Sequence, residues 1–237
     1  MALVPVGRYL VVSPVAVDEG VYVPDLPRRL HELPPSSSPM LIVGHEEDCT
    51  MAQAWLEAGG RTVEVVDRPH VGSATELPAW RLWNPHPWIL EASVGTGRAL
   101  DLGCGAGRDA VCLAAAGWEV LAVDNLPDAL DRTHDLKSRY APEACLDTGL
   151  SIRDGEFDLI TMIRYFDPIF FRSLADRVRP GGAVIVETYS ENHRNLTGRP
   201  KQANLVLTRE IVDSTMGFRV ERWETGPVWT RLELHRD

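Results

Sequence analysis

The sequence predicts an α/β fold with two domains that both contain parallel strands. In the run 98–124, an apolar strand, a glycine-rich loop, a helical pattern and a second strand follow one another. The segment 157–163 is almost continuously apolar, which is typical of a strand buried on both faces of a parallel sheet. A similar strand–loop–helix–strand pattern occupies residues 40–66. These three observations together indicate alternating strands and helices along most of the chain.

The glycine-rich loop after the strand 98–102 is the first candidate for ligand binding. Gly103, Gly105 and Gly107 let the backbone approach a ligand closely, because glycine lacks Cβ and tolerates positive φ. A helical pattern over 109–116 follows the loop, so free N–H groups at the start of this helix face the same place. The loop therefore predicts a ligand at the carboxyl ends of parallel strands.

Two carboxylates indicate which ligand this loop takes. Asp101 stands two residues before Gly103, where a buried carboxylate would repel a pyrophosphate and suit a cationic ligand without phosphate. S-adenosylmethionine has these properties, because it carries an ammonium and a sulfonium. Asp124 ends the next strand, over 119–123, and can accept both hydrogen bonds from a ribose diol.

Four segments now occur in order and at matching spacing, namely 100–107, 123–124, 157–162 and 178–186. Together they resemble a class I S-adenosylmethionine-dependent methyltransferase, and the resemblance covers residues 98–190. It implies a Rossmann-like domain with a seven-stranded sheet over 98–237. Within this family, the runs 107–110 and 198–200 are most similar to small-molecule methyltransferases related to tellurite-resistance enzymes.

The remaining elements of this domain follow from apolar periodicity and from the positions of proline and glycine. We expect, in chain order, a helix over 128–140, a third strand over 143–146 that ends at Asp147, a fourth strand over 157–163, a helix over 169–178, a fifth strand over 183–188, a helix over 208–216 and an antiparallel pair of strands over 218–223 and 228–234.

The resemblance implies a set of cofactor-binding residues around the strand ends. Asp124 is expected on the ribose, the third strand's end on the adenine amino group, and Cys104 through its backbone rather than its thiol. The set comprises Asp101, Gly103, Cys104, Gly105, Gly107, Asp124, Asn125, Asp147, Thr148 and Ile163.

Methyl transfer is an in-line displacement at an activated carbon, so the protein must mainly align the acceptor and exclude water. A thiolate or another soft chalcogen anion needs no general base, whereas an oxygen or nitrogen acceptor is helped by one. Candidate bases are His86, His193, Glu187 and Tyr165. No cluster with metal-ligand spacing stands out, so no metal is expected.

Residues 1–80 are expected to form a separate small α/β domain, joined through a linker over 81–97 to the domain over 98–237. The pattern over 40–66 resembles a rhodanese-like domain, in which a catalytic cysteine opens the loop after the central strand. Here that position is Gly44, and the acidic loop that follows is unsuited to a persulfide anion. Cys49 lies too late in the segment. We therefore expect a degenerate, catalytically silent domain that serves packing, dimerisation or substrate gating.

The net charge of the chain indicates which kinds of molecule it can bind. The net charge of −10 argues against binding to a phosphate backbone, so a small-molecule substrate is favoured over nucleic acid. One local segment is basic despite the acidic net charge. It is either a solvated loop, or a site for an anionic substrate or a lid over the active site. It consists of His193, Arg194, Arg199, Lys201 and Arg209.

The sequence shows no apolar run long enough to span a membrane and no secretory pattern at its start, so neither a membrane nor export is expected. Its four cysteines have no paired or metal-ligand spacing and read as reduced cytoplasmic thiols. Three alternatives stay open beside a small-molecule enzyme. They are an RNA or protein methyltransferase that uses the basic segment, a non-catalytic cofactor-binding or sulfur-sensing protein, and a sulfurtransferase that uses Cys49.

Overall fold

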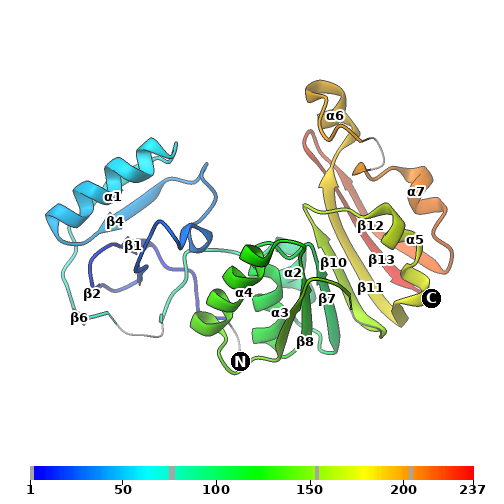
Figure 1. Cartoon of the computed structure of the whole chain (residues 1–237), viewed down its shortest axis with the longest axis horizontal. Coiled ribbons are helices and arrows are strands. Elements are labelled where there is room, and N and C mark those ends of the chain that lie inside the picture. The colour runs from blue at the N-terminus through cyan, green and yellow to red at the C-terminus, as the bar shows by residue number, and fades with distance from the viewer. Residues whose placement is uncertain (1–2, 75–77, 153–154, 203–204) are drawn as a thin grey trace. The chain divides into compact units, whose positions relative to one another are not determined.

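The computed structural model describes residues 3–74, 78–152, 155–202 and 205–237. Contacts between residues divide the chain into two compact units. Figure 1 shows both, coloured by residue number from blue at the N-terminus to red at the C-terminus. Unit 1 holds residues 86–134 and 143–237, and unit 2 holds the chain up to Pro85 together with 135–142. The domain limits expected from the sequence at residues 80 and 97 stay a prediction.

Unit 1 is built on a seven-stranded sheet with the order β12-β13-β11-β10-β7-β8-β9. The five strands from β11 to β9 run parallel, and β13 and β12 complete the sheet antiparallel. The strands are β7 (Arg98–Leu102), β8 (Glu119–Val123), β9 (Leu146–Gly149), β10 (Phe157–Ile163), β11 (Val178–Tyr189), β12 (Phe218–Thr225) and β13 (Trp229–Arg236). The predicted α/β fold with a largely parallel sheet is confirmed, as is the antiparallel pair near its end.

The order of strands fixes where a ligand can bind. After β7 the chain adds β8 and β9 on one side, and then crosses to the other side to place β10 and β11. Such a reversal leaves a crevice at the carboxyl ends of the strands on either side of the switch point. In unit 1 this crevice lies at the ends of β7 and β10, next to the glycine-rich loop.

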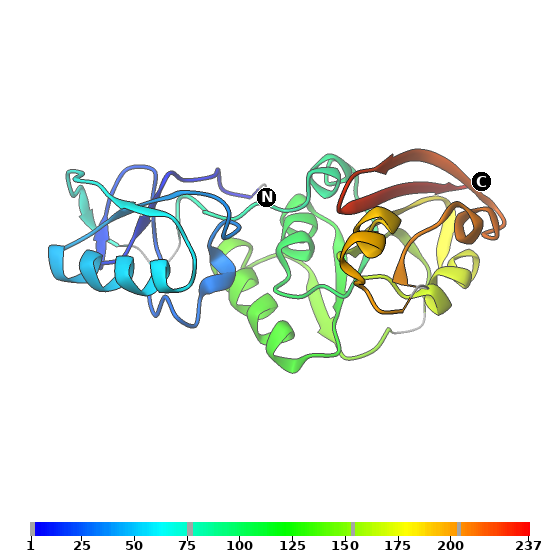
Figure 2. The same ribbon diagram turned by 90° about the horizontal axis from the view of Figure 1, so that it is seen from above.

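Within the described residues, six α-helices and one 3₁₀ turn lie around this sheet. Figure 1 shows α3 and α4 beside β7 and β8, while α5 and α7 lie near β11 and β13, and Figure 2 shows β12 and β13 as the red outer edge. The helices are α2 (Pro87–Ala92), α3 (Arg108–Ala116), α4 (Pro127–Tyr140), α5 (Pro168–Arg172), the short 3₁₀ turn η2 (Leu174–Asp176), α6 (Glu191–Thr197) and α7 (Arg209–Asp213).

Apolar residues of the central strands form the core of unit 1. Leu100, Ile160 and Val184 are fully buried and come from three neighbouring parallel strands. Phe157 and Phe171 fill the space toward α5 and are almost inaccessible to solvent. The residues 157–163 are apolar almost without interruption because β10 is covered on both faces, as the sequence predicts.

Several expected elements differ in extent. The third strand was expected over 143–146 but runs as β9 over Leu146–Gly149, because the residues after Pro142 form a turn. The expected helix over 169–178 is wrong in its second half. There α5 ends at Arg172, a 3₁₀ turn follows, and β11 already begins at Val178. Helix α7 is also shorter than the expected 208–216.

Unit 2 contains a four-stranded parallel sheet in the order β3-β1-β4-β5. Its strands are β1 (Tyr9–Val11), β3 (Gly20–Tyr22), β4 (Met40–Val43) and β5 (Val63–Val65), with a small antiparallel pair of β2 (Val15–Ala16) and β6 (Gly72–Ser73) and the 3₁₀ turn η1 (Leu30–Glu32). Helix α1 (Glu46–Ala58) packs its Leu56 against Leu10 and Ile42. Acidic residues in its first turn stabilise its N-terminal end.

Within the described residues, none of the helices combines the length and apolar character needed to cross a bilayer.

Candidate functional site

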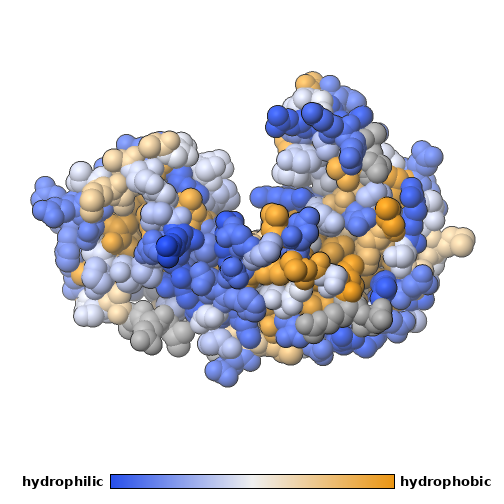
Figure 3. Space-filling model, in the orientation of Figure 1, coloured by the Kyte–Doolittle hydropathy of each residue, from blue (hydrophilic) through white to orange (hydrophobic). Residues whose placement is uncertain are grey.

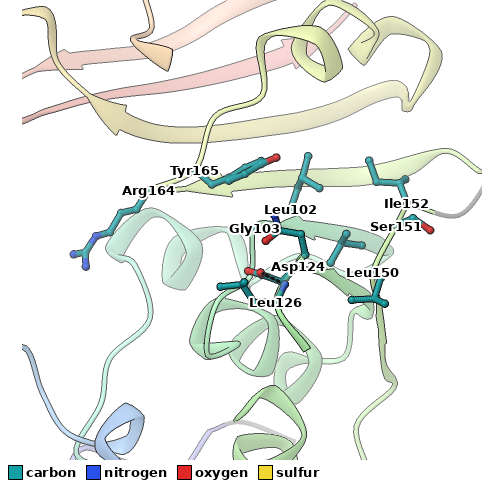
Figure 4. A pocket seen from close by; sticks show the side chains of 11 residues that line it. Leu102, Gly103, Asp124, Leu126, Leu150, Ser151, Ile152, Arg164 and Tyr165 are labelled. Atoms are coloured by element: carbon teal, nitrogen blue, oxygen red, sulfur yellow. Dashed lines mark hydrogen bonds between the residues drawn. The ribbon is translucent and has the colours of Figure 1, made fainter. Parts of the chain in front are cut away.

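A pocket of about 450 Å³ opens at the carboxyl ends of four parallel strands of unit 1 (Figure 4). The segments that follow β7, β8, β9 and β10 each contribute to its wall. Its lining residues are Leu102, Gly103, Val123, Asp124, Asn125, Leu126, Leu150, Ser151, Ile152, Arg164 and Tyr165. The pocket therefore lies at the switch point of the sheet, where the sequence places the ligand.

The glycine-rich loop forms one wall of this pocket. The N–H groups of Gly103 and Cys104 donate to the backbone oxygen of Val123, at 2.8 and 3.0 Å, which ties the loop to the end of β8. Gly103 has a φ of +75°, and a Cβ built there would lie 2.4 Å from Cγ of Tyr165. Only glycine fits at this position, because both the backbone conformation and the packing exclude a side chain.

Asp124 is held rigidly at the opposite side of the loop. Its Oδ2 accepts the N–H of Gly105 at 2.9 Å, and its Oδ1 accepts the N–H of Leu126 at 3.0 Å. Figure 4 shows the second of these bonds as a dashed line. Each carboxylate oxygen keeps a further lone pair, so both can accept hydroxyl groups of a ribose diol.

Asp101 lies beneath the loop and is only 2% exposed. Its Oδ1 accepts the hydroxyl of Thr161 at 2.8 Å. Its Oδ2 makes no hydrogen bond of normal geometry within the described residues, although the backbone N–H of Ala110 in the first turn of α3 lies near enough to the carboxylate to favour its ionised form. Burial, together with the neighbouring carboxylates of Asp109 and Asp124, raises the pKa of Asp101 to about 7.

These properties suit a cation. A buried carboxylate with an oxygen that lacks a good hydrogen bond is stabilised by any ligand that brings an ammonium close to it, whereas a phosphate would add to the repulsion that already raises its pKa. The residues present therefore fit S-adenosylmethionine, with carboxylates at Asp101 and Asp124 and the glycine backbone between them.

Of the other residues expected at the cofactor, some line the pocket and others do not. Asn125 lines the pocket, whereas Asp147 and Thr148 on β9 do not, and Thr148 instead lies 2.9 Å from the ring of His134. Leu150, Ser151 and Ile152 line the pocket at this strand, because β9 runs three residues further than expected.

Gly107, Cys104 and Ile163 support the pocket without lining it. Gly107 caps α3 with a φ of +77° and leaves no room for a side chain beside Thr133. The thiol of Cys104 lies 3.8 Å from the Thr133 hydroxyl, and burial raises its pKa, so it stays a neutral thiol. Ile163 is the last residue of β10.

His86 and Glu187 form a buried pair beside the pocket. His86 Nε2 lies 3.0 Å from Oε2 of Glu187, and His86 Nδ1 accepts the N–H of Trp88 at the start of α2. Because a carboxylate only accepts, the ring carries its proton on Nε2, and both nitrogens are occupied. Burial opposes ionisation of Glu187, yet hydrogen bonds from His86 and Arg231 outweigh it and lower its pKa to about 2.

Tyr165 and His193 have different surroundings. Tyr165 lines the pocket above Gly103, and burial raises the pKa of its phenol, with Asp167 and Asp124 adding to the effect. His193 on α6 stacks on the ring of Tyr189 at 4.7 Å. Of the four candidate bases, Tyr165 alone lines this pocket.

Some pocket residues carry no motif that would have marked them. Leu126 and Leu150 are 61% and 63% exposed and give the pocket an apolar wall. Figure 3 shows hydrophobic surface over the part of unit 1 that holds β7 and β10, below a mostly hydrophilic region at α6. Within the described residues, no group of three or more His, Cys, Asp or Glu side chains is arranged to hold a metal ion.

A family model described as a methyltransferase domain matches residues 87–236. Among curated relatives, ubiquinone biosynthesis O-methyltransferase from Pseudomonas aeruginosa is 29% identical over 116 residues, and the same enzyme from Aromatoleum aromaticum is 30% identical over 118 residues. The matches cover 44% and 45% of this chain. The chain spans about half the length of these relatives, with 50% of each covered.

Two solved structures share the fold of unit 1. TehB from Haemophilus influenzae aligns with a TM-score of 0.55 and 14% identity, covering 65% of this chain and 63% of that one. The N-methyltransferase NodS from Bradyrhizobium japonicum, in complex with S-adenosyl-L-homocysteine, aligns with a TM-score of 0.52 and 16% identity, covering 65% and 88%.

Proposed function

The chain belongs to the methyltransferase domain family, and from that premise we propose that it methylates a small-molecule acceptor, namely a thiol, a chalcogen oxyanion or a carboxylate. Its cofactor is S-adenosylmethionine, and it is an enzyme. The observation that carries the proposal is the pocket itself. Asp124, Gly103 and two exposed leucines line it, and the buried carboxylate of Asp101 lies beneath the glycine loop without itself lining the pocket.

The bound cofactor supplies a methyl group that is already activated by its sulfonium. Asp101 would hold the ammonium end, Asp124 the ribose, and the backbone of Gly103 and Gly105 the space between them. These contacts align the methyl carbon and keep water away, which is the main contribution that this reaction asks of a protein.

Three of the four candidate bases are unsuited to removing a proton, and the fourth, His193, does not line the cofactor pocket, so an acceptor that needs no base is favoured. Both nitrogens of His86 are occupied, Glu187 is an ion-paired carboxylate of low pKa, and the phenol of Tyr165 stays protonated because its pKa is raised. A thiolate, a chalcogen oxyanion or a carboxylate is already anionic at neutral pH or close to it, so no proton has to be removed during the transfer.

Turnover of methyl-labelled S-adenosylmethionine against a panel of thiols, oxyanions and carboxylic acids tests this proposal. Transfer to at least one of them, lost in Asp101→Asn and kept in the surface variant Asp128→Asn, is expected. Transfer to RNA or protein with none to any small acceptor would overturn the substrate class. Tight cofactor binding without any transfer would favour a sensing role.

For unit 2 we propose a degenerate rhodanese-like domain without sulfur-transfer activity. The loop after β4 begins at Gly44, where a Cβ would lie 2.5 Å from Oγ of Ser13. Cys49 is 2% exposed, and burial followed by the neighbouring Asp48 raises its pKa, the reverse of what a reactive thiol needs. The four-stranded parallel sheet with α1 after β4 supports the resemblance.

The finer assignments stay proposals as well. We propose a place near the tellurite-resistance branch of small-molecule methyltransferases, a homodimer formed through the first domain, and a cytoplasmic location, which the unpaired thiols of Cys49, Cys104 and Cys145 support. Size-exclusion chromatography with light scattering tests the dimer, and a monomer at micromolar concentration would contradict it.

A further inference from the structure

Beside the cofactor pocket, three aromatic rings form a stack that the mechanism above does not use. The ring of His193 lies 4.7 Å from that of Tyr189 at an angle of 14°, and Tyr189 lies 4.5 Å from Trp229 at 21°. We call these three residues the aromatic ladder. Tyr189 ends β11, Trp229 begins β13 opposite it, and His193 is on α6, so the ladder stands at the carboxyl edge of the sheet.

Arg164 adds a cation to one end of this ladder. Its guanidinium carbon lies 5.5 Å from the centre of the Trp229 ring, within the range of a cation–π contact. Arg164 follows directly after β10 and also lines the cofactor pocket, and Figure 4 shows its side chain directed away from Asp124 and Leu150. It thus connects the pocket with the ladder.

The backbone holds Arg164 in an unusual conformation. Its φ is +58°, in the left-handed region that arginine rarely adopts. A 2.7 Å hydrogen bond from its N–H to the backbone oxygen of Glu187 fixes this turn at the end of β10. Such a conformation costs energy, and it is typical of positions where a side chain must be aimed at a ligand.

The positive charge of Arg164 is only partly compensated by the protein: it acts on the carboxylates of Glu187 and Asp109 without a short ion pair to either. In the described part of the chain its side chain makes one ion pair, with Nε 3.5 Å from Glu187 Oε1, which is too long for a hydrogen bond. The two short contacts of Glu187, with Arg231 at 2.7 Å and with His86 at 3.0 Å, are both to Oε2, so Arg164 approaches only the other oxygen, Oε1. The Arg164 side chain is 66% exposed, so its planar fork of donors can pair with an anion.

From this juxtaposition we propose that Arg164 and the aromatic ladder form the acceptor site, and that the acceptor is a small aromatic carboxylic acid. The carboxylate pairs with the guanidinium, and the ring packs against the ladder. This inference rests on the proposed function, because it identifies the substrate class for the same pocket.

Three probes separate the ring from the charge in a calorimetric titration of the full chain saturated with S-adenosylhomocysteine. These are 2-naphthoate, its neutral amide 2-naphthamide, and cyclohexanecarboxylate. We expect 2-naphthoate to bind at least about tenfold more tightly than either of the others, as an Arg–carboxylate pair and a ring contact each contribute that much. Arg164→Gln should abolish the preference for acid over amide, and Arg164→Lys should restore part of it.

Arg219→Gln is the matched control. Arg219 is 61% exposed and also pairs with a glutamate, but it lies near the start of β12, at the opposite edge of the same sheet. This variant should bind 2-naphthoate like the parent chain, whereas Trp229→Leu should weaken it. Binding of S-adenosylhomocysteine to each variant shows whether the pocket is intact.

The outcomes discriminate between the two proposals. Without any binding of S-adenosylhomocysteine by the parent chain, the proposed function fails, and this inference with it. With normal cofactor binding, the inference alone is overturned if no aromatic acid binds at millimolar concentration, if acid and amide bind equally, or if Arg164→Gln changes nothing. Binding of inorganic phosphate in competition with 2-naphthoate would also overturn it, since the site would then recognise any anion.

Discussion

A buried carboxylate oxygen without a donor destabilises a folded protein unless a ligand supplies one. Oδ2 of Asp101 makes no hydrogen bond of normal geometry within the described residues, and it lies beneath the loop that borders the pocket. Asp101 therefore lowers the stability of the free protein and strengthens the binding of the ligand, a trade-off that is common at ligand sites. This makes Asp101 the residue at which binding and stability should respond in opposite directions.

Replacing Asp101 by asparagine should weaken S-adenosylmethionine binding at least about tenfold, since a hydrogen bond to a charged group contributes about 1.5–3 kcal/mol. The free variant should melt at the same temperature as the parent chain or higher, because a buried charge is removed. Calorimetric titration and thermal unfolding measure the two effects. Asp128→Asn, whose side chain is 74% exposed, should change neither.

The pKa of Asp101 leads to a pH dependence of opposite sign for stability and binding. In the unfolded chain the carboxyl loses its proton near its ordinary value of 3.8, but in the folded protein it does so at about 7. Between these values the folded state binds more protons, so the stability of the free protein falls as pH rises from about 4 to 7. Cofactor affinity should increase through the same range, as the ionised form is the one that pairs with an ammonium.

Urea unfolding at a series of pH values, compared with Asp101→Asn, checks this expectation. The variant should lack the fall in stability over that range. If the stability of the parent chain and of the variant changes with pH in the same way, the raised pKa of Asp101 is not the cause of the pH dependence.

The strand–loop–helix element from β7 to α3 depends on glycines that no other residue can replace. Gly103→Ala should cost about 1–2 kcal/mol through its left-handed backbone alone, and more because Cβ would lie 2.4 Å from Tyr165. It should also block the cofactor by moving Tyr165 in the pocket. Thermal unfolding and a titration with S-adenosylhomocysteine measure both.

Gly181→Ala separates the two contributions. Gly181 has a φ of +79°, but a Cβ there would meet nothing within 4 Å. Its replacement should therefore show the backbone cost without the loss of binding. Equal effects of the two substitutions would mean that the contact with Tyr165 is unimportant.

The elements that the sequence predicts best are those with a single dominant signal. Strand β10 has the bounds 157–163 that its continuous apolar run predicts. Helix α3 ends at Ala116, as predicted, and is capped by Gly117, whose φ of +108° only glycine readily adopts.

The predictions that were wrong concern segments in which neighbouring residues favour different structures. Pro180, Gly181 and Gly182 favour the end of the expected helix, yet they lie inside β11. They are tolerated there because they fall where the register between β11 and β10 is interrupted, between Val178 and Ala183.

The same division applies to the pocket. Gly103, Asp124 and Asn125 line it as the motif predicts, because strand ends and tight turns are local properties of the sequence. Residues 150–152 line it only because β9 has its particular length, and the aromatic ladder exists only because β13 pairs with β11 in one register. Contacts between distant segments leave no mark in a short window of sequence.

At the scale of the whole chain, our proposal places the chemistry in unit 1 and none in unit 2. Cys49→Ser should therefore leave methyl transfer unchanged within about twofold and lower stability by about 1 kcal/mol, because a buried thiol is exchanged for a hydroxyl. Neither protein should show thiosulfate sulfurtransferase activity. Activity in the parent chain that disappears in the variant would restore a catalytic role to this cysteine.

The net charge of −10 sets the expectation for macromolecular partners. An acidic surface repels RNA, so any binding should be weak and should vanish as salt is raised. Neutralising Arg199 and Lys201 should leave methyl transfer to a small acceptor unchanged. Tight RNA binding that depends on these two residues would favour the alternative of an RNA methyltransferase.

The central claim is that an acidic strand end and its glycine loop select a cationic adenosyl ligand over phosphate-bearing nucleotides. Calorimetric titration of the full chain with S-adenosylhomocysteine, NAD and ATP under one set of conditions tests it most directly. The account predicts saturable heat with S-adenosylhomocysteine, weakened by Asp101→Asn, and none with NAD or ATP. Firm binding of NAD or ATP with no heat from S-adenosylhomocysteine would contradict it.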